Sequence, residues 1–347
     1  MPTNAIAAAL DSIVLGPSVV VHNLTMIPLV ANRASTSSTR STVSTSSTLG
    51  TFSTPSTDAD GSRAAAEYLV LDEALSSGVV EITEVSEQGS VPDLNFVNRG
   101  ARPVLIVDGE ELLGAKQNRV VNLSILVAAN SELTIPVSCV EAGRWRSRSR
   151  HFTAAPRTQY ATGRAKRMAD VSLSMMVRGE RLSDQAGVWE DIAAKACRLE
   201  ADSPTSAMEA IFERHVGSID EYVAGCRPVE GQVGAFFFVG ETLIGFDLFD
   251  RPSTLSKLLP KLVRSVAVDA IDAASMRSKS HDSASAGLDA NAIHARAEQF
   301  LAVASDAPQH VTAGVGVGED LRITAPRIAG AALVTNSHLV HLGAFAL

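Results

Sequence analysis

The stretch from Gly109 to Trp145, GEELLGAKQNRVVNLSILVAANSELTIPVSCVEAGRW, most constrains how this chain can fold. Its apolar runs RVVNLSILVAA and LTIPVSCVE are rich in β-branched residues and predict two strands, with NSE as the turn between them. Polar residues stand at the ends of these runs, and a buried polar group costs free energy unless it is hydrogen-bonded. The stretch therefore predicts a β unit with a polar cluster held at the ends of its strands.

The rest of the chain places this stretch in an α+β fold. Residues from about 16 to 145 carry mostly strand patterns, and we expect them to form one mostly antiparallel β unit. The C-terminal half should hold helices plus further β-strands. Helices are expected at 183–200 with Ser183 as N-cap, at 203–225, at 253–272 with a kink or restart at Pro260, and at 287–305; strands are expected at 231–250, with a turn at Gly240, and at 310–347.

A segment of almost pure serine and threonine interrupts the N-terminal strands. It runs from Ala34 to Ser62 and cannot bury enough apolar surface to offset the entropy of an ordered chain, so we expect a disordered insertion. The chain then divides into N-terminal strands at 1–33, the insertion at 34–62, a β-rich core at 63–150 and an α+β part at 151–347. All but the insertion are expected to belong to one domain.

Charge and cysteine content exclude several classes of protein. A net charge of −8 argues against a general nucleic-acid binder, although residues 142–169 hold eight basic residues and no acidic one. The three cysteines are widely spaced without a CxxC pair, so we expect reduced thiols in a cytoplasmic protein rather than a zinc site or a disulfide framework. The scattered histidines indicate no metal site. The sequence predicts neither a signal peptide nor a membrane-spanning helix.

The tetrapeptide formed by Lys116, Gln117, Asn118 and Arg119 is the strongest candidate for ligand binding. Lysine and arginine supply positive donors, while glutamine and asparagine both donate and accept hydrogen bonds. With Asn122 close behind, the set suits a ligand that carries phosphates and hydroxyls or amides, such as a nucleotide or an ADP-ribose-like molecule. The alternative is a polar turn between strands, because turns favour the same residues.

Glu110, Glu141 and Cys139 are the candidates for catalysis. Glu110 and Glu111 are adjacent, so in a strand they face opposite ways and only one of them can share a site with Arg119. A carboxylate in a partly apolar cleft suits a general base or a partner for ribose hydroxyls, but a salt bridge to a nearby arginine explains it equally well. Cys139 is a nucleophile only if nearby cations lower the pKa of its thiol; otherwise it is a half-buried small residue.

Alternating arginines follow the second predicted strand. In an extended chain they share one positive face suited to phosphate, and Arg144 and Trp145 join the ligand-binding candidates. Trp145 would face the other way and anchor the strand in the core. The alternative for most of this run is a flexible loop from Ser147 to Thr162. The arginines concerned are Arg144, Arg146, Arg148 and Arg150.

The chain carries none of the common catalytic motifs. The patterns GxxxxGK[ST], HExxH and GxSxG do not occur. The segment AGVGVGED, residues 313–320, is rich in glycine like a phosphate-binding loop, but a strand pattern follows it where such a loop requires a helix. A β-turn is the better interpretation.

Five motifs, taken in order, resemble one family. They are YLVLDEALSSGVVEITE, PVLIVDGEELLGAKQNR, IPVSCVEAGRW, SDQAGVWEDI and VHLGAF. They are similar to the ARG-and-Rhodanese-Phosphatase-superfamily-associated (ARPP) domain family over about Val19 to Leu347, with the Ser/Thr-rich segment as a departure. The resemblance implies a context of ADP-ribose or NAD-derived metabolites, through an association with ADP-ribosylglycohydrolases. It carries over no catalytic residue and indicates no cofactor.

Three hypotheses follow from these observations. In the first, the protein binds or processes an ADP-ribose- or nucleotide-like ligand, with Lys116, Arg119 and Arg144 on phosphate and Glu110 or Glu141 as the acid or base. In the second, the polar cluster is a structural network in a non-enzymatic interaction or scaffold protein. In the third, the protein is a thiol-dependent enzyme that uses Cys139.

Overall fold

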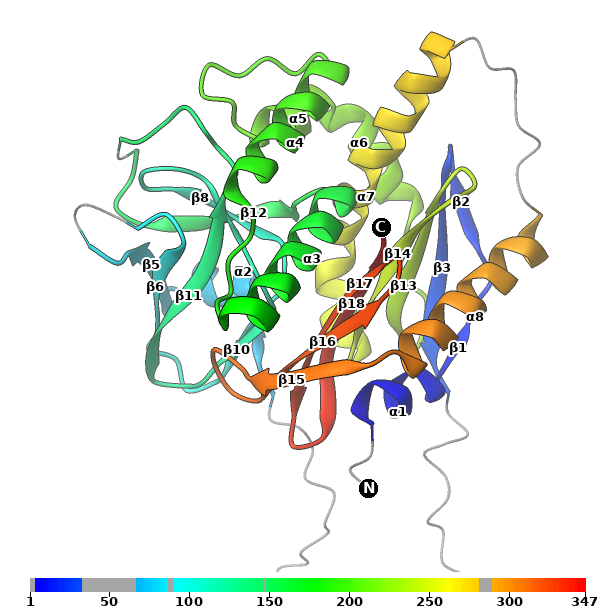
Figure 1. Ribbon diagram of the computed structural model, residues 1–347, viewed down its shortest axis with the longest axis horizontal. Coiled ribbons are helices and arrows are strands. Elements are labelled where there is room, and N and C mark those ends of the chain that lie inside the picture. The colour runs from blue at the N-terminus through cyan, green and yellow to red at the C-terminus, as the bar shows by residue number, and fades with distance from the viewer. Residues whose placement is uncertain (1–3, 33–66, 87–89, 147, 281–288) are drawn as a thin grey trace, which may run out of the picture.

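The computed structural model describes residues 4–32, 67–86, 90–146, 148–280 and 289–347 (Figure 1). The predicted Ser/Thr-rich insertion at 34–62 lies outside these residues. The described chain forms helices α1–α8 and strands β1–β18, in an α+β arrangement with almost entirely antiparallel sheets. The fold class predicted from the sequence is therefore confirmed.

A nine-stranded antiparallel sheet joins the two ends of the chain. Its N-terminal strand β3 pairs with β13 from the C-terminal half, so residues more than 200 positions apart are neighbours. Across the sheet the strands are β1 (Ile13–Leu15), β3 (Leu24–Ala31), β13 (Gln232–Val239), β14 (Thr242–Phe249), β18 (His338–Ala346), β17 (Ile328–Thr335), β16 (Glu319–Ala325) and β15 (Gln309–Ala313), with β2 (Val19–Val21) paired to the start of β3.

The middle of the chain forms a second β unit beside this sheet (Figure 1). One part is a six-stranded antiparallel sheet and the other a three-stranded sheet in which β4 and β7 are parallel. The six strands, in order, are β12 (Phe152–Thr158), β8 (Glu110–Gly114), β9 (Arg119–Val121), β11 (Ser131–Cys139), β6 (Asp93–Asn98) and β5 (Val80–Glu84); the three are β10 (Ile125–Val127), β7 (Val104–Ile106) and β4 (Leu69–Val70).

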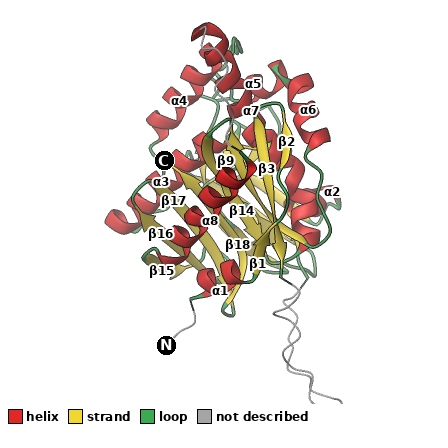
Figure 2. Ribbon diagram, turned by 90° about the vertical axis from the view of Figure 1, so that its right-hand side faces the viewer, coloured by secondary structure: helices red, strands yellow, loops and turns green. Residues whose placement is uncertain are grey.

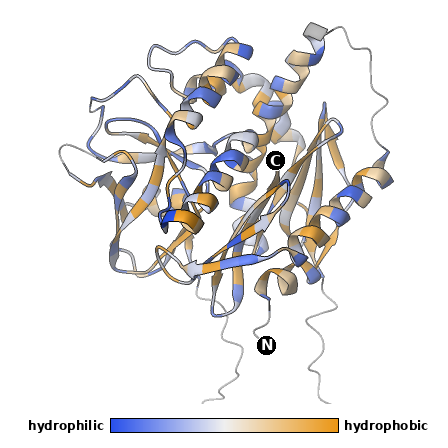
Figure 3. Ribbon diagram, viewed as in Figure 1, coloured by the Kyte–Doolittle hydropathy of each residue, from blue (hydrophilic) through white to orange (hydrophobic). Residues whose placement is uncertain are grey.

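Helices cover both faces of the nine-stranded sheet. On one face, α1 and α8 pack over alternate residues of β13 such as Phe236 and Phe238, and Figure 2 shows both helices across this face. In Figure 3, α8 carries hydrophilic residues beside apolar ones, as expected for a helix with one buried side. On the other face, Phe237 packs in a core that includes residues of α3, α4, α5, α6 and α7. The helices are α1 (Ala5–Asp11), α2 (Leu71–Ser76), α3 (Ala161–Arg178), α4 (Gln185–Arg198), α5 (Glu209–Arg214), α6 (Val216–Gly225), α7 (Pro252–Ser280) and α8 (Ala290–Asp306).

Helix α7 connects the two β regions. It contacts β12 of the β unit and β13 of the nine-stranded sheet, and Figure 1 shows it between them. The helix runs without a break through Pro260, which corrects the predicted restart at that residue. Its Lys261 is buried and forms ion pairs with Asp72 at 2.8 Å and with Glu110 at 2.6 Å. The helix therefore fixes the start of β8, where the candidate site begins.

Two predictions of strand pairing are wrong. The strands of residues 13–31 belong to the nine-stranded sheet, so they do not extend the β unit that begins near residue 69. The predicted hairpin around NSE also does not form, because β10 pairs with β7 while β11 pairs with β6 and β9. In both cases the strand patterns are right, but their partners lie far away in the sequence.

Local predictions fail after Trp145. Residues 147–162, expected as a loop, contain β12 and lead directly into α3, which the sequence patterns did not reveal. The N-cap of α4 is Asp184, whose carboxylate accepts from the Ala186 backbone N–H at 3.1 Å, rather than Ser183. By contrast, the turn at Gly240 is confirmed, and residues 314–318 form the loop that joins the paired strands β15 and β16.

Gly245→Ala is expected to lower the free energy of unfolding by about 1–3 kcal/mol. Gly245 has a φ of 145°, and a Cβ added there would lie 2.3 Å from the Ala344 carbonyl oxygen of the paired strand β18. Chemical denaturation measures the change. Gly217→Ala is the matched control, because nothing lies within 4 Å of its added Cβ and α6 favours alanine. Equal effects of the two substitutions would contradict this account of the β14–β18 contact.

Candidate functional site

The predicted polar cluster assembles where β8 and β11 end and β9 begins. The turn after β8 carries Lys116, Gln117 and Asn118, while Glu141 and Arg144 follow β11. Antiparallel pairing of β9 with β11 sets Arg119 opposite Cys139. The sheet register thus brings together two motifs that lie about twenty residues apart in the sequence.

Glu141 and Arg144 form the centre of a fully paired inner network. The Arg144 Nε and Nη2 atoms donate to the two carboxylate oxygens of Glu141 at 2.9 and 2.7 Å. The Asn118 backbone N–H and the Thr205 hydroxyl also donate to this carboxylate, at 3.1 and 2.7 Å. Burial alone would raise the pKa of Glu141, but these donors hold it below its ordinary value. Glu141 is therefore an ionised acceptor that fixes the loop after β11.

The remaining donors of Arg144 are also used. Its Nη1 atom donates to the Ala115 carbonyl at 2.6 Å, and Nη2 reaches the Asn118 side-chain oxygen at 3.3 Å. The Asn118 amide donates to Glu209 of α5 at 3.3 Å. Arg144 thus ties the turn after β8 to its own loop.

Arg119 behaves differently, although it is completely buried. Its Nη1 atom donates to the Gln117 side-chain oxygen at 3.1 Å. Its Nε and Nη2 atoms have no hydrogen-bond partner among the residues that the structure describes. Burial lowers the pKa of Arg119, and nearby Cys139 and Glu84 only partly oppose that effect. Arg119 is a desolvated cation with one edge of its guanidinium unused.

Trp145 lies over this cation. The centre of its ring is 5.7 Å from the Arg119 guanidinium carbon and 5.4 Å from the Lys116 Nζ atom. Its side chain is 48% exposed, so the prediction that Trp145 anchors the strand in the core is wrong. The ring instead lies partly exposed over Arg119, with Lys116 at its side.

Glu84, at the end of β5, is a member of the cluster that the sequence did not single out. One of its carboxylate oxygens accepts from the Lys116 backbone N–H at 3.2 Å. The other is buried without a partner among the described residues. Glu84 is one more carboxylate in a plain alternating strand, so only the pairing of β5 with β6, and of β6 with β11, brings it here. Arg119, Glu84, Lys116, Gln117, Cys139 and Trp145 are called the outer group below.

Cys139 is held in a form poorly suited to nucleophilic attack. Its residue is fully buried, and its backbone is bound on both sides by the Gln185 side chain at 2.8 Å. Burial raises the pKa of the thiol to about 11, against the opposing effect of Arg119. A thiolate is the reactive form, so this environment favours a structural role.

Iodoacetamide at pH 8 is expected to modify Cys197 and leave Cys139 unmodified in the native protein. Cys197 is exposed, whereas Cys139 is buried with a raised pKa. Mass spectrometry of the digested protein reads out each site, and denaturant should make both cysteines reactive. Rapid alkylation of native Cys139 would revive the thiol-enzyme hypothesis.

Glu110 and Glu111 face opposite ways, as predicted. Glu110 accepts from Lys261 at 2.6 Å and from the Val107 backbone N–H at 2.8 Å. Glu111 accepts from Arg157 at 2.6 Å, and burial raises its pKa despite that pair. Neither carboxylate is bonded to Arg119 in the described chain. Both are held within the β unit and its contacts with the helices.

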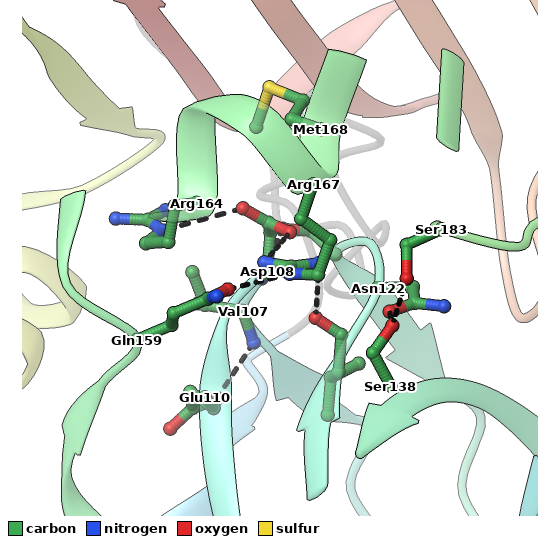
Figure 4. Close-up of polar contacts among 12 residues, drawn as sticks. Val107, Asp108, Glu110, Asn122, Ser138, Gln159, Arg164, Arg167, Met168 and Ser183 are labelled. Carbon is green, nitrogen blue, oxygen red and sulfur yellow. Dashed lines mark hydrogen bonds and ion pairs between the residues drawn. The ribbon is translucent and has the colours of Figure 1, made fainter. Parts of the chain in front are cut away.

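Asn122 lies in a separate chain of hydrogen bonds, which Figure 4 shows. Its side-chain oxygen accepts from Ser138 at 2.6 Å, and the two serines Ser138 and Ser183 lie 2.6 Å apart. Its amide donates to the Arg181 carbonyl at 3.0 Å. Asn122 therefore fixes β11 to the segment before α4.

The basic stretch predicted from the sequence divides into two kinds of residue. Arg146, Arg148 and Arg150 are exposed near Trp145. Arg157 of β12 and Arg164 and Arg167 of α3 are buried against carboxylates, whereas Lys166 of α3 is exposed. Figure 4 shows Arg164 and Arg167 both reaching Asp108. The exposed part alone can contact an anionic ligand.

Two absences from the described residues bear on the class of protein. Across the described ranges, no group of three or more His, Cys, Asp and Glu side chains is placed to hold a metal ion. No helix among them is long and apolar enough to cross a membrane. The fold and site define an α+β protein with a buried arginine beneath an exposed tryptophan at the end of a β unit.

The chain belongs to the family of the ARG and Rhodanese-Phosphatase-superfamily-associated Protein domain, whose model matches residues 12–345. This confirms the resemblance found in the sequence. No curated protein and no solved structure matches the chain.

Proposed function

We propose that this protein binds a small ligand through an anionic group, carboxylate or phosphate, that pairs with Arg119. The observation that carries the proposal is the edge of the Arg119 guanidinium formed by Nε and Nη2, which has no hydrogen-bond partner in the described parts of the chain. The same edge of Arg144 is filled by the Glu141 carboxylate at 2.9 and 2.7 Å. Two parallel N–H donors match a carboxylate or a phosphate in geometry and charge.

Trp145 and Lys116 make a nucleotide-like ligand the best fit to this site. An exposed indole ring offers a flat surface to a base, and Lys116 beside it adds a second positive group. The exposed Arg146, Arg148 and Arg150 lie on the same loop and suit further phosphates. Because Arg119 is wholly buried, Trp145 must shift for the ligand to reach it. ADP-ribose, suggested by the family's associations, combines these features.

Isothermal titration of the full chain with inorganic phosphate, AMP and ADP-ribose tests the proposal. We expect saturable binding of at least one nucleotide, tighter than that of phosphate alone. Arg119→Met should abolish this binding. Trp145→Ala should lower the affinity for the nucleotides more than the affinity for phosphate. Arg178→Met, at the C-terminal end of α3, is the control and should change nothing. Unchanged nucleotide affinity in Arg119→Met would refute the proposal.

The inner network supports the alternative of a non-enzymatic interaction protein. The polar groups of Glu141, Arg144 and Asn118 are hydrogen-bonded to one another, as expected of a structural network. A cooperatively melting protein that binds none of the three probes would favour this alternative. A catalytic role of Glu110 or Glu141 is a further step of the proposal and requires turnover of the bound ligand. A cytoplasmic location is also part of it, on the three widely spaced cysteines.

A further inference from the structure

A second constellation, separate from the outer group, joins three residues that are distant in the sequence. The Ser124 hydroxyl oxygen lies 2.7 Å from the His341 Nδ1 atom. The His341 Nε2 atom lies 3.1 Å from a carboxylate oxygen of Asp247. Ser124 precedes β10, whereas His341 and Asp247 lie on the paired strands β18 and β14. Hydroxyl, imidazole and carboxylate in hydrogen-bonded series are the parts of an activated serine nucleophile.

The charges around Asp247 fix the protons of this series. Arg164 donates to both oxygens of Asp247, at 3.0 and 2.8 Å. An ionised Asp247 accepts from the Nε2–H of His341, which leaves the lone pair of Nδ1 facing Ser124. The Asp108 backbone N–H donates to the Ser124 oxygen at 3.0 Å. The Ser124 hydroxyl proton is thereby directed to Nδ1, as a general base requires.

Burial and stacking hold the base in position. His341 and Asp247 are each 1% exposed, while Ser124 is only partly buried. The His341 ring stacks on Phe249 with centroids 4.7 Å apart. Ser124 is therefore the member of the series that lies nearest to solvent. Water is kept from the imidazole, which strengthens its hydrogen bonds on both sides.

We propose that Ser124 is an activated nucleophile that accepts an acyl group from an activated ester. The Ser124 oxygen bonds to the ester carbonyl carbon while its proton passes to His341 Nδ1. The bond from that carbon to the leaving oxygen then breaks, and the leaving oxygen takes the proton from Nδ1. Water attacks the acyl-serine in the same way, which releases the acid and restores the Ser124 hydroxyl. Asp247 stays ionised and stabilises the transient imidazolium throughout.

No motif could have revealed this series. The chain has no GxSxG segment, and positions 124, 247 and 341 converge only because β14 pairs with β18 beneath the start of β10. Such series are recognised by geometry rather than by spacing. The alternative explanation is that these contacts only hold the β unit against the sheet. The test therefore measures the reactivity of Ser124 rather than the stability of the protein.

Fluorophosphonate labelling of the full chain, with the site mapped by mass spectrometry, is that test. We expect Ser124 to be labelled and Ser124→Ala to be unlabelled. Ser138→Ala, which removes a serine without an imidazole partner, should leave labelling unchanged. His341→Gln, if its circular dichroism is native, should slow labelling at least about a hundredfold.

The outcomes separate the two explanations. Labelling at Ser124 that slows in His341→Gln, together with hydrolysis of p-nitrophenyl acetate that Ser124→Ala removes, supports the proposal. An unlabelled Ser124 in a folded wild-type protein overturns it, as does an unchanged labelling rate in natively folded His341→Gln. Neither outcome bears on Arg119, because the two sites share no residue.

Discussion

Arg164→Met is expected to lower the free energy of unfolding by about 3–5 kcal/mol, because it removes one partner of a buried ion pair. Arg164 is 1% exposed and donates to Asp247 at 3.0 and 2.8 Å and to Asp108 at 3.4 Å. Without it, two buried carboxylates lose a cation that joins α3 to both β regions. Chemical denaturation followed by circular dichroism measures the change.

Lys166→Met is the matched control, two residues along the same helix. Lys166 is 64% exposed and pairs with Asp191 at the surface, so its loss should change stability by less than about 1 kcal/mol. If Arg164→Met had no larger effect than Lys166→Met, the network around Asp108 and Asp247 would not be what holds α3 in place.

The same pair predicts a pH dependence. Burial alone would raise the pKa of Asp247, but Arg164 and His341 hold it well below its ordinary value. A carboxyl group with a lowered folded-state pKa contributes stability that is present above the unfolded pKa of about 3.9 and lost as the pH falls through the folded pKa. The wild type should therefore lose stability below about pH 4, and Arg164→Met should lose less over that range.

Arg119→Met is expected to remove ligand binding and yet to raise the free energy of unfolding by about 1–3 kcal/mol. Arg119 is buried, and two of its nitrogen atoms have no hydrogen-bond partner among the residues that the structure describes. Burial lowers its pKa. A basic group whose pKa is lower in the folded state than in the unfolded state lowers the free energy of unfolding at neutral pH, where it is charged in both states. Methionine at this position removes that destabilising effect. Residues that bind a ligand often carry such a trade-off between stability and function. Thermal and chemical denaturation measure it.

Arg144→Met supplies the comparison, since Arg144 has the same side chain in the same cluster. Its donors are bound to Glu141 and to backbone carbonyls, so its loss should destabilise the fold by about 3–5 kcal/mol. Destabilisation of similar size by Arg119→Met would mean that Arg119 is one more member of the structural network. The alternative of a scaffold protein would then be preferred.

The sequence predicts elements whose signal is local. The turn at Gly240 and the helices α4 to α8 were predicted from turn residues and from the spacing of apolar residues. Both signals extend over only a few positions of the sequence. Helix α3 was not predicted because Arg164 and Arg167 interrupt the apolar residues Ala161, Ala165, Met168, Val171 and Met175 on its buried side. Its period is hidden in residues that usually face water, and only the carboxylates of other elements explain their burial.

The site shows the same limit. The chemistry of Lys116, Arg119 and Arg144 is evident from the sequence, as is their common place at the strand ends. Which arginine is paired and which is open depends on Glu141, Glu84 and Trp145, whose positions follow from sheet register and from the path of one loop. No spacing rule distinguishes Arg144 from Arg119, although their hydrogen bonds differ completely.

Fluorescence of Trp145 during titration with ADP-ribose tests the central claim most directly, because the ring lies over Arg119 and must move when an anion binds there. Trp189→Phe removes the other tryptophan and leaves Trp145 as the only reporter. We predict a saturable change that disappears when Arg119→Met is added to this background. A folded protein whose Trp145 fluorescence does not respond, or responds equally without Arg119, would contradict the claim that this arginine binds the ligand.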